Sequence, residues 1–507
     1  MKHFKSLFLA AVALCLIISQ GNPLTVHGAT TSITYSGNLP SYQNHTYHFS
    51  NASEGVLNVN FVNGNDMVYF ITEAGGDGDS YISGDTLPVG EYEFTISPNS
   101  KISTNYEVTI SGDLALTGQA TLPSLNITSP SAAHTRLGID DFNINFSGSS
   151  NGALNYTLNH NSPISLSSSF SKNLNLLFGS NTISTYAALT NKNYITDVRT
   201  VVSPGVMRLS GADRFDTAVN VSKEIEKEGY AIDTVIITNA YNFADGLPGV
   251  VLGHKEVAPL LTTRSDYLPA AIKSEITRLG ATKAIILGGT GSISSAVENE
   301  LVTMGLATER ISGLDRYAVS ASIAERIINE HSNSAIIVNG QNYPDGLMAA
   351  PYAGNTQQPI LYTTPDSLPG SIKTFLNDHP NINEFTIVGG TGVVSQAVEA
   401  ELEQYGSVYR VDGQDRYEVG INIGYGLDFQ KRQIVLVSNE SDGVPAALLS
   451  SLKDSQMMLT KPTALPGNVN DYITGLGYEG LLDNIYIVGG TASVSQSIED
   501  YIRGVIQ

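Results

Sequence analysis

The chain has 507 residues, of which 41% are hydrophobic and 15% charged, and its formal net charge is −21. This length is too great for a single hydrophobic core, and the composition is that of folded domains, which excludes a largely disordered protein. The acidic balance also argues against a nucleic-acid-binding protein, because such a protein needs a basic face that displaces counterions from phosphates.

The first 29 residues have the pattern of a secretory signal peptide. Lys2 and Lys5 precede an apolar run at 7–18, which is too short to span a bilayer comfortably, and we expect cleavage near Ala29. The only cysteine, Cys15, lies inside this run, so the mature chain is expected to have no disulfide and no thiolate metal ligand. No later segment is apolar enough to span a membrane and no sortase-type signal follows. We therefore expect a secreted protein that is either released or carries its own binding module.

Residues 30–205 are rich in Ser, Thr, Asn and Tyr, and short candidate strands alternate with turn residues. Apolar and polar residues alternate from Val56 to Phe61, as in a strand with one buried face. A Leu-Pro-Ser break at 122–124 divides the region into two parts of similar length. The pattern predicts two all-β sandwiches. The predicted sandwiches occupy residues 30–115 and 120–203.

Three landmarks recur at intervals of about 100 residues in the rest of the sequence. The first is an opening Arg-x-x-Gly-x-Asp-Arg followed by Phe or Tyr, the second is an Asp-Gly pair, and the third is Gly-Gly-Thr. Because all three keep one phase through three copies, they predict tandem repeats. The openings begin at Arg208, Arg310 and Arg410, the Asp-Gly pairs at Asp245, Asp345 and Asp442, and the predicted repeats are 206–305, 308–406 and 408–507.

Within each copy the pattern alternates between helix and strand. In the first copy, Asp213 is placed to cap a helix whose apolar residues share one face, and 234–238 is a buried strand. A proline opens a second helix at 269–279, the strand at 283–287 ends in glycines, and Ser294 caps a last helix. Strands that alternate with helices predict a parallel sheet with right-handed crossovers in each copy.

The three copies resemble the type 2 cell-wall-binding repeats of Gram-positive bacteria, through all three landmarks and over residues 206–507. The resemblance implies three Rossmann-like α/β modules packed about a pseudo-threefold axis. It also implies non-covalent attachment to an anionic wall polysaccharide or a teichoic-acid-like polymer, with neighbours in a surface layer as further candidate partners. The third copy departs from the pattern, because it lacks the aromatic residue present as Phe243 and Tyr343, and Asp412 replaces a serine.

The N-terminal region resembles two other bacterial families. Residues 31–112 resemble prepeptidase C-terminal-type sandwiches through Leu-Pro-x-Gly-x-Tyr at 87–92, and residues 120–203 resemble a bacterial immunoglobulin-like domain through Gly-Ser-Asn-Thr-Ile at 179–183. The expected fold is therefore two N-terminal all-β sandwiches followed by three Rossmann-like α/β repeats.

The repeated arginines are the first candidates for polymer binding, because a guanidinium can hold phosphate or carboxylate with two hydrogen bonds. In the Asp-Arg pairs, the competing interpretation is that Asp caps a helix while Arg pairs with a neighbouring copy, and we favour it slightly. The earlier arginines lie at a strand edge, and the two interpretations are about equal there. The candidates are Arg214, Arg316 and Arg416 in the Asp-Arg pairs, and Arg208, Arg310 and Arg410 before them.

The glycine pairs and the Asp-Gly pairs complete the candidate set. Each glycine pair ends a strand and opens a helix, where backbone N–H groups can hold an anion, although close strand–helix packing is the more common reason for glycine there. Each Asp-Gly pair is typical of a turn, but it follows a strand at the end where open α/β sheets bind ligands. These candidates are Gly289, Gly390 and Gly490, with Asp245, Asp345 and Asp442.

Net acidity is compatible with an anionic partner. At physiological salt the Debye length is about 8 Å, so distant acidic faces are screened while arginines in contact with the polymer are not. Bridging by a divalent cation is a second route that stays open. If each copy binds weakly, tethering three of them raises avidity by roughly 10² to 10⁴.

Catalytic signatures are missing from the sequence. It contains no His-Glu-x-x-His, Gly-x-Ser-x-Gly or Walker pattern, and no histidine recurs across the copies. Asp77, Asp79 and Asp85 lack the spacing of a calcium loop, so we expect a solvated turn there. We therefore expect no catalytic residue, no cofactor and no metal site.

The leading hypothesis is non-covalent anchoring of a secreted surface protein to the Gram-positive cell wall, with the β domains as a spacer or an adhesive head. Two alternatives come from other classes. The chain could modify a wall amidase as an accessory protein, or it could be an α/β enzyme that uses the glycine loops for a nucleotide.

Overall fold

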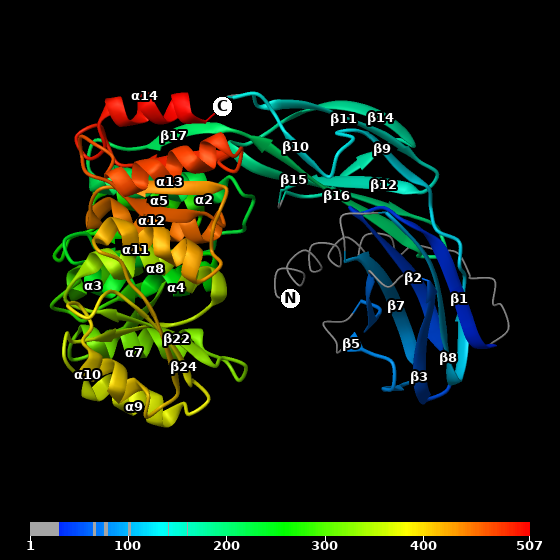
Figure 1. Cartoon of the computed structure of the whole chain (residues 1–507), viewed down its shortest axis with the longest axis horizontal. Coiled ribbons are helices and arrows are strands. Elements are labelled where there is room, and N and C mark those ends of the chain that lie inside the picture. The colour runs from blue at the N-terminus through cyan, green and yellow to red at the C-terminus, as the bar shows by residue number, and fades with distance from the viewer. Residues whose placement is uncertain are drawn as a thin grey trace. The chain divides into compact units, whose positions relative to one another are not determined.

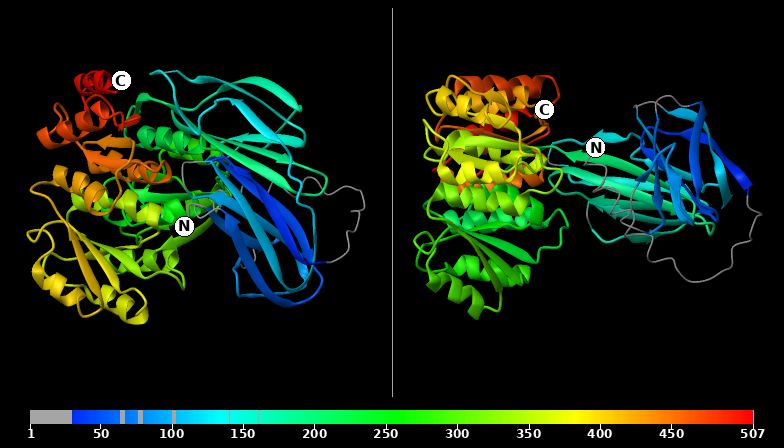
Figure 2. Two further views of the ribbon diagram at one scale, coloured as in Figure 1. Left: turned by 45° about the vertical axis from the view of Figure 1, so that its right-hand side comes forward. Right: turned by 90° about the horizontal axis from the view of Figure 1, so that it is seen from below.

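The computed structural model describes residues 30–63, 67–75, 80–99, 103–139, 141–159 and 161–506. The predicted signal peptide lies outside the described residues, as do Asp77 and Asp79. The chain divides into two compact units, unit 1 up to Ser203 and unit 2 from Pro204 onward (Figure 1). Unit 1 consists of strands, whereas strands alternate with helices in unit 2, as two further views also show (Figure 2).

The N-terminal strands confirm that this region consists of β-sheet. The strand predicted around Val56 to Phe61 is β3, and the Leu-Pro-x-Gly-x-Tyr motif at 87–92 lies in β6, β7 and the turn between them. The described strands of unit 1 are β1 (Thr30–Leu39), β2 (Gln43–Asn51), β3 (Gly55–Asn63), β4 (Met67–Glu73), β5 (Ser80–Tyr81), β6 (Thr86–Leu87), β7 (Gly90–Pro98), β8 (Thr104–Gly118), β9 (Leu125–Ser129), β10 (His134–Arg136), β11 (Asn143–Ser150), β12 (Ala153–Leu158), β13 (Ile164–Leu166), β14 (Ser169–Asn175), β15 (Gly179–Ala188) and β16 (Tyr194–Ser203).

Unit 1 has two large hydrophobic cores, one around Tyr47 and Phe94 and one around Phe146 and Ile183, and a small third cluster of Tyr186, Ala188 and Tyr194. Strand pairing nevertheless continues from one half to the other. The longer sheet runs β13-β12-β15-β16-β2-β7-β4-β5, and β16 pairs antiparallel with β2 over Tyr194–Asp197, while a second sheet runs β14-β11-β9. The pairing of β16 with β2 thus joins the two halves that were expected to form separate domains, and it satisfies the N–H and C=O groups along these strands.

Unit 2 confirms the predicted alternation of strands and helices, and each of the strands predicted in the first copy is present. The described elements are β17 (Gly205–Leu209), α2 (Arg214–Glu226), β18 (Thr234–Asn239), α3 (Phe243–Gly246), α4 (Gly249–Glu256), β19 (Leu260–Thr263), α5 (Ala270–Leu279), β20 (Lys283–Leu287), α6 (Ser295–Thr303), β21 (Ala307–Ile311), α7 (Arg316–Ile327), β22 (Ser334–Asn339), α8 (Tyr343–Thr356), β23 (Ile360–Thr363), α9 (Gly370–Asp378), β24 (Glu384–Val388), α10 (Gln396–Leu402), β25 (Ser407–Val411), α11 (Arg416–Gly426), β26 (Gln433–Val437), α12 (Glu440–Leu452), β27 (Gln456–Leu459), α13 (Gly467–Tyr478), β28 (Asn484–Val488) and α14 (Gln496–Val505).

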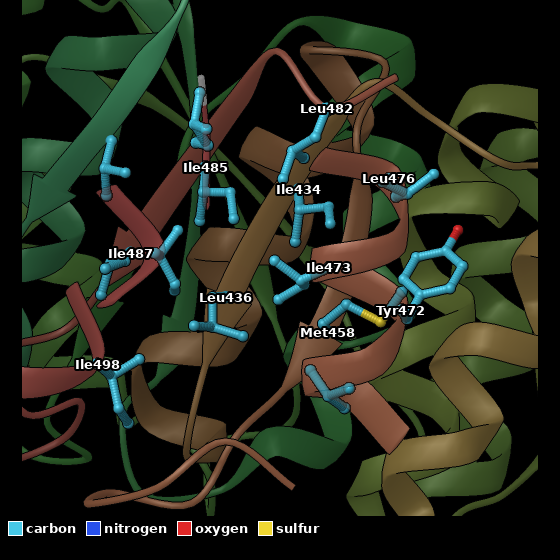
Figure 3. Close-up of a cluster of buried hydrophobic side chains, with 14 of the residues drawn as sticks. Ile434, Leu436, Met458, Tyr472, Ile473, Leu476, Leu482, Ile485, Ile487 and Ile498 are labelled. Carbon is cyan, nitrogen blue, oxygen red and sulfur yellow. The ribbon is translucent and has the colours of Figure 1, made fainter. Parts of the chain in front are cut away.

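Three four-stranded parallel sheets organise these elements. The first sheet runs β19-β18-β20-β21, the second β23-β22-β24-β25 and the third β17-β28-β26-β27. Each sheet has its own hydrophobic core. In the third, Ile434 and Ile487 from the strands pack with Ile473 of α13 and Ile498 of α14 (Figure 3). Strands buried on both faces explain the continuous apolar runs in the sequence.

Each sheet is completed by the opening strand of another repeat. β21 opens the second repeat but pairs in parallel with β20 of the first, and β25 opens the third repeat but pairs with β24 of the second. The strand that opens the first repeat, β17, pairs with β28 of the third. The strand exchange therefore forms a closed cycle, in which the beginning of unit 2 completes its last sheet.

Helices α4, α8 and α12 pack against one another in unit 2 (Figure 1). The glycine of each Asp-Gly pair lies at these contacts. A Cβ on Gly246 would lie 3.1 Å from Val444 Cγ1 of the third repeat, one on Gly346 would lie 3.1 Å from Leu247 Cδ2 of the first, and one on Gly443 would lie 2.5 Å from Leu347 Cδ2 of the second. Packing between copies thus explains why glycine recurs at this landmark, and at Gly246 the approach of Thr238 Oγ1 of the same repeat to 2.6 Å from the added Cβ also contributes.

Gly443→Ala tests this packing. We expect it to lower the free energy of unfolding of unit 2 by about 1–3 kcal/mol, because the added methyl group overpacks the contact with Leu347. Gly392→Ala is the matched control, since nothing lies within 4 Å of the added Cβ, and it should change stability by less than about 0.5 kcal/mol. Urea unfolding followed by circular dichroism measures both, and equal effects of the two substitutions would contradict the packing argument.

Candidate functional site

The first arginine of each repeat is held by the protein itself. Arg310 Nη1 donates to the carbonyl oxygen of Gly288 at 2.8 Å, and its Nη2 lies 2.8 Å from Glu298 Oε2 of α6. Arg410 makes the same contacts with Gly389 at 2.6 Å and with Glu399 at 2.7 Å. The two arginine side chains are only 12–13% exposed. Each therefore fastens the last helix and the glycine pair of one repeat to the opening strand of the next.

Arg208 forms the same clamp between the two ends of unit 2. Its Nη1 donates to the carbonyl oxygen of Gly489 at 2.9 Å, and its Nε donates to Glu499 Oε2 at 2.7 Å. Glu499 also accepts from Arg503 at 3.1 Å. The clamp joins residues 291 positions apart, whereas the equivalent Arg310 and Arg410 clamps are local in sequence.

The second arginine of each repeat lies at the carboxyl edge of a sheet, where its parallel strands end. Arg214 Nη1 donates to the carbonyl oxygen of Ala240 at 2.9 Å, and Arg316 Nη1 donates to that of Gly340 at 2.6 Å. The aspartate before each of these arginines caps its helix, as predicted, since its side chain accepts backbone N–H groups of the first turn. The capping aspartates are Asp213, Asp315 and Asp415.

The aspartates of the Asp-Gly pairs are buried near these arginines, and each is only 5–6% exposed. Burial raises the pKa of all three carboxyl groups, and it raises the pKa of Asp345 to about 6. An arginine of another repeat opposes each shift and lowers the pKa. These arginine–aspartate pairs link each repeat to the next and so form a cycle. The pairs are Arg316 with Asp245, Arg416 with Asp345 and Arg214 with Asp442.

Each buried carboxylate explains the first glycine of a Gly-Gly-Thr landmark. A Cβ on Gly389 or Gly489 would lie 2.8 Å from an Oδ2 of Asp345 or Asp442, and one on Gly288 would overlap Asp245. All three glycines have φ between 103° and 124°, which favours glycine independently. Close packing between the two landmarks of one repeat is thus a property of the first glycine.

The second glycines, which are the ones in the candidate set, have open space around them. An added Cβ would meet nothing within 4 Å at Gly390 or Gly490, and only a backbone oxygen at 3.9 Å at Gly289. Packing therefore does not require glycine at these positions. Whether their N–H groups hold an anion stays a prediction.

Two repeated positions that the sequence analysis missed also belong to this edge. Asn239 and Asn339 end β18 and β22, and they donate from Nδ2 to the carbonyl oxygens of Ser292 and Val393 at 2.6 and 2.8 Å. The clamp glutamates Glu298, Glu399 and Glu499 were missed as well. Both sets recur in phase with the landmarks, so the same repeat comparison could have found them.

Among the described residues, cations that form no ion pair within 4.0 Å gather at the carboxyl edges. Within the described residues of unit 2, 13 of the lysines and arginines form ion pairs with a carboxylate. Five of the others follow the carboxyl end of a strand, which is where parallel sheets bind ligands. The five edge cations are Arg214, Arg264, Arg316, Arg416 and Lys461.

None of the helices described is both long and apolar enough to cross a bilayer. In the same part of the chain, no cluster of three His, Cys, Asp or Glu side chains is arranged to hold a metal ion.

The model of one protein family, Cell wall binding domain 2, matches residues 208–298, 310–399 and 410–499, which is more than half of the chain. The chain belongs to this cell wall binding family. The three repeats of unit 2 are therefore cell wall binding domains, and each matched segment begins at a clamp arginine.

Two curated proteins of Bacillus subtilis (strain 168) are similar to the chain. The amidase enhancer is 33% identical over 295 residues, which are 58% of this chain and 39% of the enhancer. The N-acetylmuramoyl-L-alanine amidase LytC is 29% identical over 303 residues, which are 59% of this chain and 58% of LytC. The similarity thus covers less than two thirds of either relative.

Two solved structures from Clostridium difficile have a similar fold. Cwp6 covers 76% of this chain and 68% of its own, with a TM-score of 0.56 and 21% identity. Cwp8 covers 88% of this chain and 74% of its own, with a TM-score of 0.52 and 18% identity. At this level of identity the two matches establish the fold of the chain.

Glu499→Gln tests the clamp that joins the first and third cell wall binding domains. We expect a loss of about 1.5–3 kcal/mol in the free energy of unfolding, because the largely buried Arg208 loses its charged acceptor. Glu309→Gln is the control, since Glu309 also contacts two cations but at the surface, and it should cost less than about 1 kcal/mol. Urea unfolding measures both variants, and similar losses would show that the clamp carries no special weight.

The raised pKa of Asp345 predicts a pH dependence. The native state favours the protonated carboxyl, so the stability it contributes is complete below about pH 4 and is lost as the pH rises through about 6. Asp345→Asn stays neutral and should remove this loss, which is on the order of 2–3 kcal/mol. Urea unfolding at pH 4.5 and pH 7.5 compares the two proteins. An identical pH dependence in the wild type and in the variant would contradict the assignment.

Proposed function

We propose that the chain is a secreted surface protein whose three cell wall binding domains hold it to an anionic polymer of the Gram-positive wall without a covalent bond. The observation that carries this proposal is the set of edge cations. Although the net charge is −21, these cations form no ion pair within 4.0 Å in the part of the chain that the structure describes. A wall polysaccharide or a teichoic-acid-like polymer supplies the matching negative charge.

The arrangement of the domains supports the proposal. The cyclic exchange of β17, β21 and β25, together with the mutual packing of α4, α8 and α12, favours three Rossmann-like modules around a pseudo-threefold axis. Such symmetry would present the three carboxyl edges in equivalent positions. Because tethered sites bind a repeating polymer cooperatively, weak contacts at each domain can sum to firm retention.

The arginines divide between two roles in this proposal. The clamp arginines are engaged by carboxylates, so we assign Arg208, Arg310 and Arg410 to the assembly of the domains. The second arginine of each repeat is attracted by a buried carboxyl group and still has N–H donors for a ligand. We therefore assign polymer contact to Arg214, Arg316 and Arg416. The buried aspartates position these arginines; they are Asp245, Asp345 and Asp442. Secondary candidates for anion contact are the N–H groups of Gly289, Gly390 and Gly490.

Unit 1 is proposed to act as a spacer or an adhesive head, with residues 30–115 and 120–203 as its two β modules. We propose a binding role without catalysis for the whole chain, since its similarity to the amidase LytC is confined to 58% of that enzyme. Neighbours in a surface layer are further candidate partners of a protein held on the wall in this way.

A second candidate function is that of an accessory protein for a wall amidase, which the 33% identity with the amidase enhancer favours. The two functions differ in what unit 2 must do. An accessory protein raises the rate at which an added amidase releases wall fragments, whereas an anchor leaves that rate unchanged. Turbidity of purified walls with the amidase, in the presence and absence of the chain, distinguishes them.

Sedimentation with purified walls tests the anchoring function. The wild-type chain should pellet with walls and stay in solution once the anionic polymer is stripped while peptidoglycan is kept. Replacing Arg214, Arg316 and Arg416 together by Ala should weaken binding at least about tenfold, since each loses charged hydrogen bonds to the polymer. Replacing exposed Lys172, Lys223 and Arg326 by Ala changes the net charge equally and should leave binding within about twofold.

Folding of each variant is checked by circular dichroism. Loss of binding in a folded variant supports polymer contact by these three arginines. Unfolding of the variant assigns them to the interface between domains instead, and equal effects of the two triple variants would show that only net charge matters.

A further inference from the structure

The first cell wall binding domain carries an additional arginine, Arg264, directly after β19. Its guanidinium carbon lies 5.2 Å from the ring centroid of Tyr241, 5.5 Å from that of Tyr267 and 5.9 Å from that of Phe215. Its Nε is buried and has no hydrogen-bond partner. A buried donor without an acceptor is costly, so a ligand that accepts from the Arg264 guanidinium would offset part of this cost.

A second guanidinium approaches the same aromatic ring. Arg214 lies 4.3 Å from the centroid of Tyr241, and neither Arg214 nor Arg264 has a carboxylate within 4.0 Å among the described residues. Two positive charges that share one ring repel each other, and the ring offsets only part of that repulsion. An anion between the two guanidinium groups would bind both and remove the repulsion.

The ring faces beside this cation pair are open to solvent. Tyr241 is 56% exposed and Tyr267 is 48% exposed, although large aromatic side chains are usually mostly buried. An exposed tyrosine offers a flat apolar face and a hydroxyl group. The C–H faces of a sugar ring match such a surface, whereas a linear polyol phosphate has no flat face to place there.

The other two repeats lack this combination in their described residues. Thr364 and Lys461 occupy the position of Arg264, and Gln341 takes the place of Tyr241 in the second repeat. In that repeat the side chain of Tyr362 lies where the first repeat has Thr262, and a Cβ on Gly340 would lie only 3.0 Å from it. The second carboxyl edge is therefore filled by its own side chain, while the first is left with an open cationic surface.

We infer that the first domain holds a distinct site for an acidic sugar unit, in which Arg214 and Arg264 bind the carboxylate or phosphate and Tyr241 and Tyr267 pack against the sugar ring. This inference rests on the proposed wall-polymer function and assigns its ligand chemistry. It also makes the three domains unequal, because the first contributes most of the affinity for an acidic glycan.

Calorimetric titration of the full chain tests the site with two probes. Polygalacturonate carries carboxylates on sugar rings, and poly(glycerol phosphate) carries anions without rings. Arg264→Gln should weaken polygalacturonate binding at least about tenfold, and Lys461→Gln, at the same position in the third domain, should weaken it less. Tyr267→Ala should weaken binding of polygalacturonate but not of poly(glycerol phosphate). Lys223→Gln, on the exposed surface of α2, is the control for net charge.

Thermal unfolding without ligand separates binding from a structural role. Arg264→Gln should melt at the wild-type temperature or above it, because the substitution removes one of two repelling charges. A lower melting temperature would overturn the inference, as would equal losses of affinity for Arg264→Gln and Lys461→Gln, or no loss in either. If the wild-type chain binds polygalacturonate through Arg264 but does not sediment with walls, the proposed function fails while this site stands.

Discussion

The pairing of β17 with β28 is the constraint on which unit 2 depends. Every sheet of unit 2 borrows its last strand from another repeat, and only this pairing joins the beginning of the region to its end. The Arg208–Glu499 ion pair fastens the joint, as Arg310 and Arg410 fasten the other two. Two of these clamps join residues close in sequence, and the third joins the first repeat to the last. The repeats therefore form a cycle of three in place of an open row.

The same cycle positions the residues of the candidate site. Strands that end at one edge bring the second arginine, the buried aspartate and the glycine pair together, although they are distant in sequence. Each buried aspartate interacts electrostatically with an arginine of another repeat, yet no ion pair within 4.0 Å joins the two among the described residues. A strongly acidic protein can in this way offer cations to an anionic polymer, since the remaining acidic surface is screened over about 8 Å at physiological salt.

Much of this could be predicted from the sequence because repetition exposes it. The capping role of Asp213, the alternating elements and the family all follow from landmarks in phase. The partner strand of each opening strand could not be predicted from the sequence, because pairing with the preceding repeat is decided by packing between distant segments. The Arg208–Glu499 contact is hidden for the same reason, whereas its equivalents are local. Arg264 escapes a repeat comparison because it occurs in one copy only, and the joined sheets of unit 1 depend on edge pairing that no local pattern encodes.

Hydrogen exchange on the full chain, measured by mass spectrometry, tests the closed cycle most directly. Peptides that cover β17 at 205–209 should be protected as strongly as those that cover β28 at 484–488, because the two strands open only when unit 2 unfolds. Exchange of the β17 peptides at the rate of a free chain end, with β28 still protected, would contradict the account.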